Sequence, residues 1–181
     1  MADKDKKEKE VEEKEAKEET GEFEVEVEYS DIANPFHPTM QSIGRFCNLY
    51  IGIEENFQLL ELNDAMLEKQ KKFEAIKAKL YKEVYDRPIP QSVHALPDED
   101  DQKKMTKEEK EKKKRLDKEY GKKLTEAQKV KVKLSYPEIR ISKDALEEAM
   151  EREKKKVEAG RDAIFISPND IAVLRQFVTF I

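Results

Sequence analysis

Two short segments, far apart in the chain, alternate strictly between apolar and polar residues. Residues 22–29 (EFEVEVEY) place apolar side chains on one face and glutamates on the other, and residues 129–136 (KVKVKLSY) do the same mainly with lysines. A period of two is typical of a strand with one buried face. Opposite charges across strands favour pairing by roughly 0.2–1 kcal/mol per pair, whereas like charges repel. We therefore predict that these two strands are neighbours in one small antiparallel sheet.

Most of the chain between these strands has a helical pattern. From residue 54 to about 85, apolar positions recur in alternating steps of three and four, which predicts a helix roughly 45–50 Å long. A second helix is predicted from about residue 106 to 128, where Thr106 and Glu109 have the spacing of a capping box. Two such helices, joined by a loop, form a helical hairpin.

Shorter elements lie on either side of the hairpin. Thr39 is predicted to cap a helix, although residues 46–53 are equally compatible with a short strand. Downstream, Ser142 is predicted to cap a helix that ends at Gly160, where a glycine commonly follows a helix. The apolar run at residues 163–166 predicts a third short strand.

The last segment begins with a strong helix-start signal. Ser167 is a capping residue, Pro168 occupies the first helical position, and Asp170 places an acid in the first turn. The predicted helix runs to the final residue, and its apolar residues form a buried face. They are Ile171, Leu174, Phe177, Val178 and Ile181.

Together these elements predict an α+β, helix-rich fold: a small antiparallel sheet with packed helices and a protruding antiparallel helical hairpin. We expect residues 1–20 to be a disordered charged tail and residues 21–53 to contribute the first strand and helix of a base. Residues 54–128 form the helical-hairpin arm, whose proline-rich acidic loop covers residues 87–105. The remainder of the base, residues 129–181, supplies a strand, a helix, a strand and the C-terminal helix.

Composition changes this picture in one respect, the distribution of charge. Charged residues make up 43% of the 181-residue chain, hydrophobic residues 37%, and mean hydropathy is −0.92. Residues 1–28 hold 6 lysines against 13 acidic residues, a net charge of −7. Residues 103–133 hold 14 lysines and arginines against 6 acidic residues, a net charge of +8. A small core with long solvated parts and segregated charge is therefore expected.

The arm contains the first candidate functional surface. If the two helices run antiparallel, the start of the first lies opposite the end of the second. The distal half of the first helix then faces residues 107–114, which contain no large apolar residue. An apolar helix face left uncovered in water is a candidate contact surface for a protein partner or for self-association. The alternative is that Ile89, Val93 and Leu96 of the loop fold back over it. The predicted partner-docking residues are Phe73, Ile76, Leu80 and Val84.

The lysine-rich second helix is the other candidate, as a phosphate-binding surface that acts through counterion release. Intervening glutamates allow i,i+4 pairing, so an ordinary solvated helix or a contact with an acidic protein explains the pattern too. The segment has one arginine and one aromatic residue, which argues against reading of base sequence. The candidate phosphate-binding residues are Lys112, Lys113, Lys114, Arg115, Lys118 and Lys122.

No catalytic, cofactor or metal site is predicted. Cys47 is the single cysteine and has apolar neighbours, which predicts a small buried hydrophobe. His37 and His94 are the only histidines, and neither has partners at ligand or triad spacing. The charged start of the chain and the lack of an apolar run of roughly 18–20 residues predict no membrane segment and a cytoplasmic location, or an assembly formed in the cytoplasm.

The sequence therefore predicts a non-catalytic structural or assembly protein. In this interpretation the chain is a subunit or adaptor of a larger macromolecular complex, such as a virion or a ribonucleoprotein particle, and docks through its arm. The alternative is a nucleic-acid-associated protein that contacts the phosphate backbone through residues 103–133.

Overall fold

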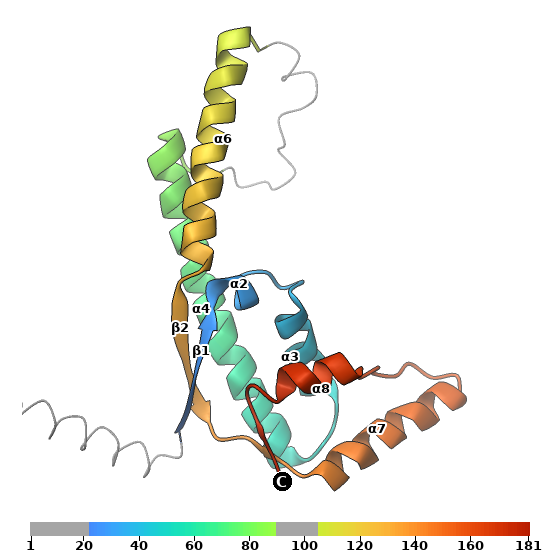
Figure 1. Cartoon of the computed structure of the whole chain (residues 1–181). Helices are drawn as coiled ribbons and strands as arrows, with labels where there is room; N and C mark the ends of the chain where they lie inside the picture. Colours follow the sequence, from blue (N-terminus) through green and yellow to red (C-terminus); the bar gives the residue numbers. More distant parts are fainter. Residues whose placement is uncertain (1–21, 90–104) are drawn as a thin grey trace, which may run out of the picture.

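The computed structural model describes residues 22–89 and 105–181, so the predictions for residues 1–20 and for most of the loop lie outside the described residues. A base of short elements carries a long arm made by α4 and α6 (Figure 1). The helix-rich α+β fold predicted from the sequence is confirmed. In chain order the elements are β1 (Glu22–Glu28), α2 (Tyr29–Ile32), α3 (Pro38–Asn48), α4 (Ile53–Tyr85), α6 (Lys107–Gln128), β2 (Lys131–Pro137), β3 (Arg140–Ile141), α7 (Lys143–Glu158), α8 (Pro168–Leu174) and β4 (Thr179–Phe180).

The predicted pairing of the acidic and basic strands is confirmed. β1 and β2 are antiparallel neighbours, with Glu26 opposite Lys133 and Glu28 opposite Lys131. Lys133 Nζ also lies 3.4 Å from Glu24 Oε2 on the exposed face. The apolar face of the pair packs against α4, which makes the sheet one wall of the core.

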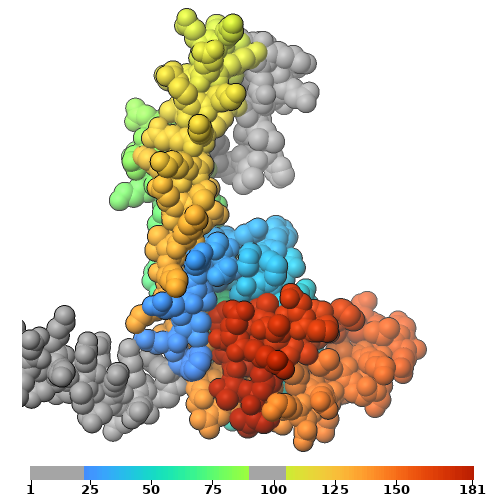
Figure 2. Space-filling model, in the orientation of Figure 1, coloured from blue at the N-terminus to red at the C-terminus, as the bar shows by residue number. Residues whose placement is uncertain are grey.

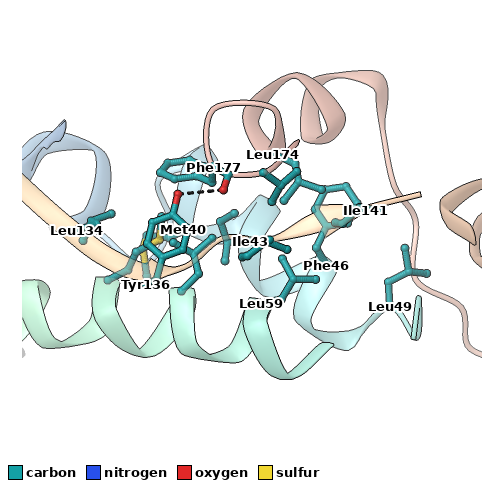
Figure 3. Close-up of a cluster of buried hydrophobic side chains, with 14 of the residues drawn as sticks. Met40, Ile43, Phe46, Leu49, Leu59, Leu134, Tyr136, Ile141, Leu174 and Phe177 are labelled. Carbon is teal, nitrogen blue, oxygen red and sulfur yellow. Dashed lines mark hydrogen bonds between the residues drawn. The ribbon is translucent and has the colours of Figure 1, made fainter. Parts of the chain in front are cut away.

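The core lies between α3, the first half of α4, the sheet and the last residues of the chain. Figure 3 shows Ile43 and Phe46 of α3 pointing toward Leu59 of α4, with Leu174 on the opposite side. Phe177 is also buried, and its carbonyl oxygen accepts a hydrogen bond of 2.9 Å from the Tyr136 hydroxyl. Burial of this hydroxyl raises the pKa of Tyr136 well above its usual range. The hydrogen bond joins the C-terminal segment to β2.

Local helix-start signals agree with the structure in most cases. Thr106 and Glu109 form the predicted capping box at α6, and Ser142 caps α7. Gly160, just beyond α7, has a positive φ of 67°, a conformation that glycine adopts without the steric cost of a Cβ atom. The cap of α3 is His37 rather than the predicted Thr39, because Pro38 occupies the first helical position.

Of the two alternatives for residues 46–53, the helix is confirmed for residues 46–48, and two other predictions about shorter elements are wrong. α3 continues to Asn48, so residues 46–48 belong to a helix and not to a strand. Residues 163–166 pair with no strand among the described residues. The last helix ends at Leu174, and residues 179–180 instead form β4, which pairs in parallel with β3. The final five residues are mostly β-branched or aromatic, which favours extended backbone over helix.

A buried carboxylate joins α8 to α3. Asp170 accepts hydrogen bonds from Ser42 Oγ at 2.6 Å and from the Arg45 guanidinium, as well as from the backbone N–H of Ser167 at 2.8 Å. Burial alone would raise the pKa of Asp170, but these donors outweigh it and hold the pKa well below the usual range. The carboxylate therefore stabilises the contact between the two helices as an anion.

Candidate functional site

The register of the arm differs from the predicted one. The Tyr120 ring of α6 contacts the rings of Tyr81 and Tyr85 near the end of α4, with centroids 5.5 and 5.9 Å apart. In the same region Lys123 Nζ lies 2.6 Å from Glu83 Oε1. The second half of α6 therefore lies beside the end of α4, and the first half of α6 extends beyond it (Figure 1). The first half of α4 faces β2 instead.

This register covers part of the predicted docking face. Phe73 is only 1% exposed, and its ring lies 4.9 Å from the ring of Tyr29 in α2. Ile76 is half-buried against the core, and Leu80 and Val84 are half-buried within the arm. Phe73 is therefore not part of an uncovered surface, which corrects the prediction for this residue. Ile76, Leu80 and Val84 keep part of their surface exposed, and their role in docking stays a prediction.

The candidate phosphate-binding residues do not share one surface. Lys112 and Lys113 line a hollow of about 270 Å³ at the arm's end, together with Tyr85 and Leu116. The other four are exposed, and at about 100° per residue they lie on the side of α6 away from Tyr120. They are Lys114, Arg115, Lys118 and Lys122. This exposed set forms a basic stripe along the outside of the arm.

An exposed apolar surface lies in residues 143–167, named here the α7 lobe. α7 extends away from the base (Figure 1) and stands at its edge in the space-filling view (Figure 2). Its buried residues are Leu146, Ala149 and Glu153. Arg152 Nη2 donates a hydrogen bond of 2.7 Å to the Tyr50 carbonyl oxygen, which links the lobe to the loop before α4.

A hollow of about 730 Å³ lies between α7 and residues 163–166. Its apolar lining includes Met150, Val157 and Phe165, of which Val157 is 63% and Phe165 is 80% exposed. Ionisable side chains also line it, and they are Glu147, Glu151, Glu153, Lys154 and Glu158. The hollow thus combines an open apolar surface with a mostly acidic rim.

The buried Glu153 carboxylate of α7 fixes the position of residues 163–166, which form the opposite wall of the hollow. It accepts a hydrogen bond of 2.8 Å from the Ile164 backbone N–H and another of 2.5 Å from Lys156 Nζ. The Lys156 ammonium and the Ile164 N–H lower the pKa of Glu153. The chain makes no turn or bend from residue 161 to 167, so it runs extended beside α7.

Two other surface features border the same part of the base. A second hollow of about 900 Å³ lies between residues 163–165 and α3, and Gly44 and Arg45 are part of its lining. On the first two turns of α4, Ile53, Phe57 and Leu60 are exposed at helical spacing. None of the three hollows described here is lined by these residues of α4.

Cys47 and His37 both take part in hydrogen bonds within the base. Cys47 Sγ donates a hydrogen bond of 3.3 Å to the Leu59 carbonyl oxygen, and burial and the nearby Asp64 carboxylate raise the pKa of Cys47 to about 11. His37 Nδ1 accepts the Thr39 N–H at the start of α3. Within residues 22–89 and 105–181 no cluster of three or more His, Cys, Asp or Glu residues is arranged to hold a metal ion. Nor does any helix there have the length and apolarity needed to cross a membrane.

Comparison with known proteins adds no further assignment. No protein-family model, curated protein or solved structure matches this chain. The case for a function therefore depends on the surfaces described above.

The sequence did contain a signal for the hollow, in its apolar residues near the end of α7. Their periodicity, however, is the same as that of residues in a buried core. Val157 and Phe165 are large apolar residues next to the strongly charged stretch of α7. Helical spacing from Leu146 through Met150 to Val157 is also the pattern of a buried helix face, and the two cases differ only in whether another element covers that face.

Proposed function

We propose that this chain is a non-catalytic structural or assembly protein, a subunit or adaptor of a larger macromolecular complex, that docks through its α7 lobe. The observation that carries this proposal is the open apolar hollow between α7 and residues 163–166, with Val157 and Phe165 at its surface. An exposed apolar surface with a polar rim is a candidate protein–protein contact.

Burial of the exposed apolar side chains of this surface would contribute to the affinity of a contact. Burying a Val or Phe side chain that is otherwise exposed stabilises a contact by roughly 1.5–3 kcal/mol. Two such residues, with Met150 beside them, supply the apolar centre that interface hot spots have. The Glu153 carboxylate adds preorganisation, because it holds residues 163–166 in an extended form before any partner binds.

The rest of the molecule suits a subunit with a spacer. At 1.5 Å per residue, the 33 residues of α4 span about 50 Å, from the core of the base to the arm. The setting that we propose for this subunit is a virion or a ribonucleoprotein particle formed in the cytoplasm.

The test is the size of the particle that contains the chain in extracts of the cells that make it. The wild-type chain should elute in a large complex, and a Val157→Asp/Phe165→Asp variant should elute as the free chain. Phe36→Asp is a matched control, because Phe36 is 77% exposed but lies outside the lobe. A wild-type chain that elutes free, or a double variant that stays in the complex, would contradict the proposal.

The exposed basic stripe supports a second candidate function, contact with a nucleic-acid phosphate backbone. Lys114, Arg115, Lys118 and Lys122 follow one side of α6. If each contacts one phosphate, the affinity should fall with a log–log salt slope of about −0.9 per contact, which for four contacts is roughly 150-fold between 50 and 200 mM salt.

Retention on immobilised duplex DNA and RNA measures this slope. Changing the four stripe residues to Ala should abolish retention. The control changes four exposed lysines of α4 to Ala instead, and these are Lys71, Lys72, Lys79 and Lys82. Equal loss in both variants would indicate only a general effect of net charge.

A further inference from the structure

The lining of the α7 hollow has a net negative charge, with four glutamates and one basic residue, Lys154. Of its acidic residues, Glu151 is 3.8 Å from Lys154 and Glu153 is bonded to Lys156. Glu147 and Glu158 form no ion pair among the described residues, and both are exposed. Two free carboxylates therefore lie along one apolar hollow.

The spacing of these two carboxylates is set by α7. Glu147 and Glu158 are eleven positions apart, which corresponds to about 16 Å along the helix. Between them lie Met150 and Val157, so the apolar surface is flanked by an acid at each end. A complementary partner needs large apolar side chains between two cationic ones.

Resting on the proposed docking function, we propose that the occupant of this hollow is a basic amphipathic segment of a different protein. Its apolar side chains contact Met150, Val157 and Phe165, and its Lys or Arg residues lie near Glu147 and Glu158. Charge complementarity of this kind determines which partners bind and accelerates their association.

A second copy of this chain is a poor fit, judged by the surfaces that the structure describes. The exposed apolar stripe of Ile53, Phe57 and Leu60 is accompanied by acidic residues, including Glu54 and Glu61. It would therefore set like charges against the rim of the hollow. The basic stripe of α6 has the right charge but includes no large exposed apolar side chain, and Val130 between two lysines is a single residue.

The experiment selects partners without assuming their identity. A phage-displayed library of random twelve-residue peptides is panned on the intact chain, and the most enriched peptide is synthesised and its Kd measured by fluorescence anisotropy. We expect enriched peptides to combine large apolar residues with at least two Lys or Arg residues.

Two charge variants then test the role of the rim. Glu147→Lys/Glu158→Lys should raise the Kd by at least about tenfold, because it replaces attraction with repulsion at both ends of the hollow. Glu54→Lys/Glu61→Lys makes the same change in net charge on α4 and should leave the Kd within about twofold. Circular dichroism checks that both variants keep the wild-type helix content.

The outcomes separate this inference from the function on which it rests. The inference would be overturned by peptides that need Val157 for binding but contain no basic residues. It would also be overturned if Glu147→Lys/Glu158→Lys left the Kd unchanged. Either outcome would leave the α7 lobe as a docking surface. Absence of enriched peptides, or binding unaffected by Val157→Asp, would overturn both. Dimers of the intact chain in sedimentation equilibrium that are lost in Val157→Asp would assign the hollow to a second copy and contradict the inference.

Discussion

The arm and the α7 lobe have similar apolar patterns in the sequence and opposite exposures in the structure. The arm residue Phe73 belongs to a stripe that faces Tyr29 and α6, and it is almost completely buried. In the lobe, Val157 and Phe165 remain open to solvent. The difference shows that exposure depends on the neighbours that an apolar face acquires, and these neighbours depend on register and on chain path.

The largest expected contrast comes from truncating one phenylalanine in each region. Phe73→Ala should lower the free energy of unfolding by about 3–5 kcal/mol, because it leaves a cavity beside Tyr29. Phe165→Ala should change it by no more than about 0.5 kcal/mol, since the ring has few contacts to lose. Urea unfolding followed by circular dichroism measures both. Equal losses would mean that the lobe is as closely packed as the arm.

The contact between α8, which follows the lobe, and α3 is tested by Asp170→Asn. This change should cost about 1.5–3 kcal/mol at pH 7, because charge-assisted hydrogen bonds from Arg45 and Ser42 are weakened. The folded-state pKa of Asp170 lies below its unfolded value of about 3.9. Its stabilisation is therefore fully present above about pH 4 and is lost as the pH falls toward the folded pKa.

The same unfolding experiment at several pH values checks the sign of this effect. The difference between wild type and Asp170→Asn should be largest at neutral pH and should shrink below about pH 4. A difference that stays constant down to pH 2 would show that the aspartate contributes by shape alone.

The sheet beside the arm offers a test of the paired charges. Lys131→Glu/Lys133→Glu should lower the stability by about 1–2 kcal/mol, because opposite charges across β1 and β2 become like charges. Lys114→Glu/Lys118→Glu on the exposed stripe of α6 is the control and should have a smaller effect. Thermal unfolding at low and high salt measures the melting temperature of both variants. The difference between the two melting temperatures should be smaller at high salt.

The smallest single effect, that of Gly121→Ala, is expected in a comparison of one glycine from each region. In α6, a Cβ at Gly121 would meet nothing within 4 Å, so Gly121→Ala should stabilise the arm by roughly 0.5–1 kcal/mol. At the end of α7, Gly160 has a φ of +67°, so Gly160→Ala should destabilise the chain by roughly 1–2 kcal/mol. Changes of the same sign in both variants would contradict this assignment of backbone strain.

Local features of this protein could be predicted from the sequence because their physical causes are local. The alternation in residues 22–29 and 129–136 predicted two strands, and their opposite charges predicted the pairing. The caps at Thr106, Ser142 and Ser167 each satisfy backbone N–H groups within the same few residues, so three helix starts were readable without knowledge of the fold.

What the sequence by itself determined, then, is where most of the elements begin and which face of each is apolar. Only the tertiary structure decided that β2, rather than α6, covers the first half of α4, and that no described element covers Val157 and Phe165. The reason is that an apolar period specifies a face to be buried and says nothing about which neighbour buries it. Contacts between distant segments made that choice, and they buried Phe73 of the arm while leaving the α7 lobe open.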